Sequence, residues 1–112
     1  MLAVPGERLA EVALFCGIQS GKTLDKVKAC GLATIESKQV SVPGIQESIA
    51  NIEMQIVHKI RSGDHMVVIG KVLKFGVDRA KNERCLLSVG PRYDGYEILA
   101  RHGIHRIGVE RA

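Results

Sequence analysis

The sequence predicts an α+β fold that is mainly β, built as a single domain over residues 1–112. Helical periodicity ends at Gly31, and the apolar period beyond it changes to two, which is typical of strands. The 12 glycines separate segments rich in Val and Ile and indicate tight turns. Helices followed by a run of strands favour α+β over a doubly wound sheet, and Gly-rich hairpins favour a small barrel.

Two helices are expected near the N-terminus. The first runs from Glu7 to Gly17, because its apolar residues recur at intervals of three and four, and Gly17 is expected to stop it. A second, short helix is expected to begin at Thr23 as its cap and to end at Gly31. The apolar stripe of the first helix consists of Leu9, Val12, Ala13 and Cys16.

Strands are expected in the rest of the chain. A weak strand covers residues 34–37, and the clearest one covers residues 49–60. Residues 61–64 form a hairpin turn, with Gly63 available for a positive φ. Residues 66–75 are apolar on both faces at their start and are predicted to form a central strand, while Gly70 indicates a bulge, a sharp barrel bend or a close ligand. Residues 85–89 form a third good strand. Alternation places Ile52, Met54, Ile56, His58 and Ile60 on one face of the first long strand.

Composition excludes several classes of protein. The net charge of +4 is mild and scattered, and the aromatic fraction is only 4%, so no nucleic-acid partner is expected. The three cysteines show no CxxC spacing, which argues against a disulfide framework and favours reduced thiols. No apolar run is long enough to span a bilayer, and the N-terminus lacks a basic region of the signal-peptide type, so a cytoplasmic protein without a membrane partner is expected.

Residues 20–23 resemble the end of a phosphate-binding loop, but the pattern is incomplete. A full loop needs Gly at position 16, where Cys16 stands, and a preceding strand, where the pattern is helical. A plain turn between helices is the alternative interpretation. No metal site is expected either, because His102 and His105 are separated by Gly103 and lack a partner motif.

His65 is the other candidate, since it leaves the turn at the mouth of the hairpin beside Asp64. An imidazole in that place is able to donate a hydrogen bond or a proton to a ligand. The alternative is a polar turn residue that faces water.

Two longer motifs can be read in the chain. The first is Cys16-Gly17-x-x-Ser20-Gly21-x-x-x-Asp25-Lys26 followed by Gly31-Leu32; the second is Asn51-Ile52-Glu53 followed by Gly63-Asp64-His65 and Ile69-Gly70-x-Val72. Both motifs resemble those of the flavin reductase-like FMN-binding split-barrel family, which includes flavoredoxins and ferric reductases. The resemblance matches only the C-terminal part of the family domain, and Met54 stands where the family often has Cys.

The resemblance implies a partial split barrel, a homodimer, and FMN near the dimer interface. It implies a reductase that passes electrons from NAD(P)H through the flavin to an acceptor. His65 would be the catalytic residue, and Ser20, Gly21, Lys22 and His65 would bind the cofactor. Weak or lost FMN binding is expected, because the N-terminal half that holds the phosphate in the family is not matched.

A second interpretation stays open: a non-catalytic truncated barrel that acts as a dimerisation or interaction module. Asp25 and Lys26 are interpreted as a structural pair that holds the loop before the second helix.

Overall fold

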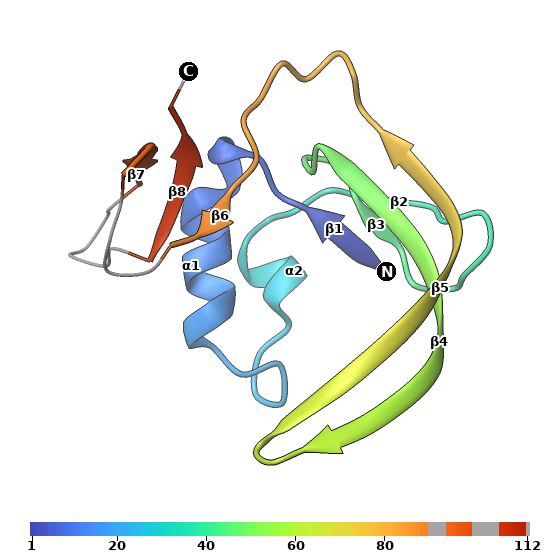
Figure 1. Ribbon diagram of the computed structural model, residues 1–112. Coiled ribbons are helices and arrows are strands. Elements are labelled where there is room, and N and C mark those ends of the chain that lie inside the picture. The colour runs from blue at the N-terminus through green and yellow to red at the C-terminus, as the bar shows by residue number, and fades with distance from the viewer. Residues whose placement is uncertain (90–93, 100–105, 112) are drawn as a thin grey trace.

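The computed structural model describes residues 1–89, 94–99 and 106–111 (Figure 1). The mainly β character and the single helical region near the N-terminus are confirmed. In chain order the elements are β1 (Leu2–Val4), the 3₁₀ helix η1 (Glu7–Leu9), α1 (Ala10–Ile18), α2 (Lys26–Ala29), β2 (Thr34–Ile35), β3 (Gly44–Ile45), β4 (Ala50–Ser62), β5 (His65–Val77), β6 (Leu87–Ser88), β7 (Tyr96–Ile98) and β8 (Ile107–Glu110).

The strands form three antiparallel sheets, in the orders β1-β4-β5, β2-β3 and β6-β8-β7. In the described part of the chain these sheets do not close into a barrel. The dominant feature is the long, curved β4–β5 hairpin, whose turn lies below the loop between α1 and α2 in the view of Figure 1. Ser62 pairs with His65 across a turn of two residues, in which Gly63 has a φ of 59°. The predicted hairpin turn is therefore confirmed.

The helices differ from expectation at their ends. Helix α1 passes through Gly17 and ends at Ile18, because this glycine keeps a helical backbone. Asp25, not Thr23, caps α2: its side chain accepts a hydrogen bond from the backbone N–H of Lys28 at 3.2 Å. After α2 the chain turns at Gly31 with a φ of 62°, as the glycine pattern predicted.

The alternation predicted for β4 is wrong in its outer half. The register shifts between Ile56 and His58, so Val57 is an extra residue opposite the pair formed with Gly70. A β-bulge of this kind moves the following side chains to the other face. His58 and Ile60 therefore lie on the opposite face from Ile52, Met54 and Ile56. A compensating shift lies between Glu53 and Met54.

Two further strand predictions need correction. Strand β5 is the edge of its sheet and not a central strand, since β4 is its only partner among the described residues. The strand predicted over residues 85–89 is paired only at Leu87–Ser88, while Cys85 forms an isolated bridge to Gly6. The His102–His105 spacing lies outside the described residues.

The third sheet is joined to the N-terminal helical region by Arg84. Its guanidinium contacts the carboxylate of Glu7 at 2.9 Å and that of Glu97 at 3.0 Å, and it donates to the backbone carbonyl of Glu110 at 3.3 Å. The side-chain hydrogen bonds to Glu7 and Glu97 raise the pKa of Arg84. One side chain thus links η1, β7 and β8.

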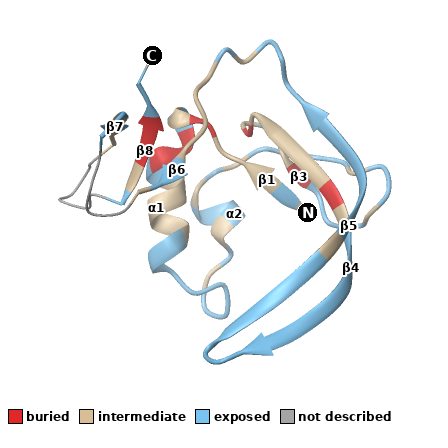
Figure 2. Ribbon diagram, in the orientation of Figure 1, coloured by how far each residue is buried: buried red, intermediate tan, exposed pale blue. Residues whose placement is uncertain are grey.

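The described residues bury very little apolar surface. Only Leu9, Ala10 and Val109 are buried hydrophobic residues among them (Figure 2). The accessible surface is 8377 Å², whereas a compact monomer of this mass exposes about 6,100 Å². The radius of gyration is 15.2 Å, against about 13 Å for a compact domain of this length. The chain is therefore more open than a self-contained domain.

Candidate functional site

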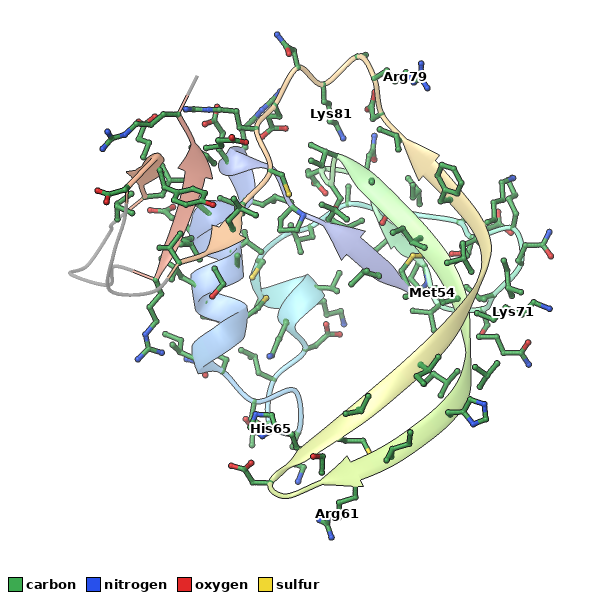
Figure 3. The ribbon with its side chains drawn as sticks, viewed as in Figure 1. Met54, Arg61, His65, Lys71, Arg79 and Lys81 are labelled. Carbon is green, nitrogen blue, oxygen red and sulfur yellow. The ribbon has the colours of Figure 1, made fainter. Side chains whose placement is uncertain are left out.

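His65 lies at the end of the long hairpin, as the sequence predicted. Its Nδ1 lies 2.6 Å from Oδ1 of Asp64, and the two side chains are 83% and 92% exposed. Figure 3 shows His65 at the tip, beyond the rest of the sheet. The tight turn places this side chain because His65 is the first residue of β5, directly after the Gly63–Asp64 turn. The imidazole is accessible to a ligand.

Ser20, Gly21 and Lys22 form an exposed turn between the two helices. The backbone N–H of Thr23 donates to the carbonyl of Ser20 at 3.2 Å, and that of Lys22 donates to the Ser20 hydroxyl at 3.3 Å. An added Cβ at Gly21 would meet nothing within 4 Å, so no close approach inside this chain requires a glycine there. Within the described chain the ammonium group of Lys22 has no ion-pair partner, which leaves it available to an anion.

The two predicted parts of the site are not bonded to one another in the described residues. Across residues 1–89, 94–99 and 106–111, no hydrogen bond or ion pair joins His65 to Ser20, Gly21 or Lys22. Asp25 and Lys26 do not pair with one another either: Asp25 caps α2, and Lys26 donates to the backbone carbonyl of Cys16 at 2.6 Å. Both residues hold the loop, but through separate backbone contacts.

A groove of about 540 Å³ lies between the base of the hairpin and the segment that joins β2 to β3. Glu53 is 7% exposed on its wall, and its Oε1 accepts three backbone hydrogen bonds, from Lys38 at 2.8 Å, Gln39 at 2.6 Å and Val40 at 3.2 Å. The bond from Gln39 is the main cause that lowers the pKa of Glu53, and burial opposes it. The hydrogen-bond donors of these three backbone amides are therefore satisfied by a carboxylate of the chain itself.

Asn51 has a similar role two residues earlier. Its side-chain oxygen accepts from the N–H of Ile45 at 2.9 Å, and its amide nitrogen donates to the carbonyl of Ile45 at 2.9 Å. The Asn51-Ile52-Glu53 motif thus fastens the segment around β3 to β4. Sequence reasoning did not find this function, because the two partner segments carry no distinctive side chains.

The hairpin carries many exposed apolar side chains on both faces and along most of its length. We call this set the hairpin apolar surface. The prediction of a central strand over residues 66–75 was wrong because an edge strand that is apolar on both faces has the same pattern as a buried central strand. Its members, each between 38% and 67% exposed, are Ile56, Val57, Ile60, Met66, Val67, Val68, Ile69, Val72, Leu73, Phe75 and Val77.

Metal ligands do not gather in the described part of the chain: no group of three or more His, Cys, Asp or Glu residues there has the arrangement needed to hold an ion. Among the same residues, no helix has the length and apolar character needed to cross a membrane.

Comparison with known proteins connects this chain to flavin chemistry. The model of the flavin reductase like domain matches residues 1–97. An uncharacterised protein of Archaeoglobus fulgidus is 36% identical over 73 residues, which are 65% of this chain and 41% of that protein. An uncharacterised protein of Pyrococcus abyssi is 32% identical over 75 residues, which are 67% of this chain and 42% of that protein. The chain thus spans about two-fifths of the length of the curated relatives it matches.

Proposed function

Because this chain belongs to the flavin reductase-like family, we propose that it binds FMN as part of an oxidoreductase that takes electrons from NAD(P)H and passes them to an acceptor. The observation that carries the proposal is the family match over residues 1–97, which includes both the Ser20–Lys22 turn and the hairpin with His65. The flavin would supply the redox chemistry, and the protein would supply binding and orientation.

One chain offers only part of a flavin site. Lys22 and the Ser20 hydroxyl are suited to a phosphate group, which needs charged or polar donors. His65 is suited to a carbonyl of the flavin or the nicotinamide. All of these groups are exposed to solvent, and within the described residues no hydrogen bond or ion pair joins His65 to the Ser20–Lys22 turn. Donors that the protein does not hold in place are poorly preorganised for a ligand, so weak FMN binding is expected.

The hairpin apolar surface supports a homodimer in which a second copy completes the site. The chain exposes about 2,300 Å² more than a compact monomer of its mass. If each copy covered that excess, a symmetric dimer would bury about 4,600 Å², which lies in the range of obligate dimers. Because both faces of the ribbon are apolar, one face would pack on the partner while the other completes a split barrel. Completing the barrel also covers the free edge of β5, which otherwise invites aggregation.

A non-catalytic interaction module is the second candidate. The observation in its favour is that the hairpin apolar surface is extensive, whereas no hydrogen bond or ion pair joins His65 to the Ser20–Lys22 turn within the described residues. The two candidates differ in one measurable property, since only the first requires a flavin.

Titration of the purified protein with FMN, followed by flavin fluorescence, tests the proposal. We expect saturable binding with a dissociation constant above the micromolar range. His65→Ala should weaken binding by about 1–3 kcal/mol, the usual loss for a hydrogen bond to a charged group. Asp64→Ala is the matched control, because it removes the neighbour in the turn and keeps the imidazole.

Three results would contradict parts of the proposal. Absence of binding at millimolar FMN would favour the interaction module. Submicromolar binding would show that a more complete site exists than the described residues provide. Equal binding by His65→Ala and the unaltered protein would reduce His65 to a turn residue.

A further inference from the structure

Two cysteines that are distant in sequence meet between the helices. Cys16 belongs to α1, and Cys30 follows α2 as its C-terminal cap. Lys26 donates from Nζ to the backbone carbonyl of Cys16 at 2.6 Å, which holds α2 against α1. The N–H of Cys30 donates to the carbonyl of Lys26 at 3.0 Å, so these two residues lie one helical turn apart on the same face. The face that contacts Cys16 therefore also carries Cys30.

The side chains of Cys30 and Cys16 are close enough to interact. Burial is the largest cause that raises the pKa of Cys30, the neighbouring Cys16 raises it further, and the charge of Lys26 opposes both. Both residues are half-buried, so a small oxidant is able to reach them. The third cysteine differs, because the Sγ of Cys85 lies 3.4 Å from the carbonyl oxygen of Leu86.

We propose that Cys16 and Cys30 form a reversible dithiol–disulfide pair that a hydroperoxide oxidises. One sulfur attacks the peroxide oxygen, the O–O bond breaks, and a sulfenic acid and an alcohol (water, if the oxidant is hydrogen peroxide) are formed. The second sulfur then attacks the sulfenic sulfur, the S–S bond forms, and water leaves. In sum, two thiols and one hydroperoxide give one disulfide, one alcohol and one water. A dithiol reductant restores the thiols by exchange.

The disulfide would close a ring that contains the whole Ser20–Lys22 turn. Chain closure of this kind restricts the conformations open to the enclosed loop. Oxidation would therefore restrain the residues to which we assign the cofactor phosphate. This consequence rests on the proposed function, whereas formation of the disulfide does not.

Thiol counting and peptide mapping test the proposal on the intact chain. The protein is treated with hydrogen peroxide, denatured, and its remaining thiols are titrated with an aromatic disulfide reagent. We expect the count to fall from three per chain to one, and to return to three after dithiothreitol. Trypsin digestion of the alkylated, oxidised protein should give peptide 9–22 linked to peptide 29–38. Cleavage after Arg8 and Lys22 releases the first peptide, and cleavage after Lys28 and Lys38 releases the second.

Three single variants separate this pair from ordinary cysteine oxidation. Cys85→Ser should still form the linked peptide, with its count falling from two thiols to none. Cys16→Ser and Cys30→Ser should each lose the linked peptide. Mapping of the unaltered chain needs no variant, so a folding defect in either variant does not affect the decision. A linked peptide that contains Cys85, a disulfide between chains, or oxidation only to sulfinic acid would overturn the proposal.

Discussion

Replacing Val68 by Asp should dissociate the proposed homodimer. Val68 is 50% exposed in one chain and lies in the middle of the hairpin apolar surface. Complete burial of a valine side chain contributes about 1.5–3 kcal/mol, so burial of the exposed half contributes about 1 kcal/mol per copy. A carboxylate in the same place adds a desolvation penalty of several kcal/mol per ion.

The symmetry of a dimer doubles each of these terms. The Asp variant should therefore weaken the dimer by at least about 5 kcal/mol, which is more than a thousandfold in the dissociation constant. The milder Val68→Ala removes two methyl groups from a half-covered site and should weaken the dimer by about 1.5 kcal/mol, or roughly tenfold. The graded pair of variants distinguishes lost apolar contact from a general charge effect.

Sedimentation velocity over a range of concentrations measures the effect. Val42→Asp is the matched control, because Val42 is 54% exposed but lies on the segment between β2 and β3, away from the hairpin. We expect the control to remain dimeric. An unaltered protein that sediments as a soluble monomer at micromolar concentration would refute the reasoning, and so would a control that dissociates as readily as Val68→Asp.

Three further predictions concern stability. Glu53→Gln should make stability, measured by thermal melting, less dependent on pH on the acid side. The hydrogen bonds from Gln39 and its neighbours lower the folded-state pKa of Glu53, so its stabilisation is complete above the ordinary glutamate pKa of about 4.3 and is lost as the pH falls through the lower folded value. An unchanged pH profile would contradict this role. Gly31→Ala should lower the free energy of unfolding in urea by about 1–2 kcal/mol, because the φ of Gly31 is 62°. Gly17→Ala, in the helix and with open space at its Cβ, should raise the free energy of unfolding by about 0.5–1 kcal/mol. Changes of the same sign in the two variants would refute the argument. Asp25→Ala should lower the free energy of unfolding by about 1 kcal/mol, because α2 loses its cap. Asp25→Asn should keep most of this stabilisation, since asparagine also caps helices. Equal losses in the two variants would show that the charge of Asp25 matters and not its capping.

Local chemistry accounts for the features that the sequence predicted correctly. The position of the first helix follows from its apolar spacing, and the end of the helical region follows from Gly31. The hairpin turn follows from a glycine next to Asp64, flanked by residues of strand character. Each of these signals acts within a few residues along the chain, where backbone preference and side-chain spacing decide the conformation.

Register was less predictable than element type. The alternation in β4 is interrupted at Val57, and nothing in the side-chain pattern of β4 itself marks this bulge; Gly70 on the partner strand was the signal that indicated one, and that prediction is confirmed. Its position depends on the pairing with β5, because the extra residue lies opposite Gly70. One inserted residue reverses the face of every later side chain, so His58 and Ile60 leave the face that holds Ile56.

The candidate site shows the same division. The presence of His65 at a hairpin mouth and of Ser20, Gly21 and Lys22 in a turn was predictable from turn-forming residues. That no hydrogen bond or ion pair joins these two parts within the described chain was not, because such contacts depend on how the long hairpin lies relative to the helices.

By itself, the sequence determined the order of helices and strands, the hairpin turn and the family, because each depends on residues close together in the chain. Only the tertiary structure decided that β5 is an edge strand, that Glu53 binds the amides of the segment around Gln39, and that the thiols of Cys16 and Cys30 meet. These properties depend on contacts between segments more than ten residues apart. The same apolar pattern, the same glutamate and the same cysteines have different roles according to which neighbours folding places beside them.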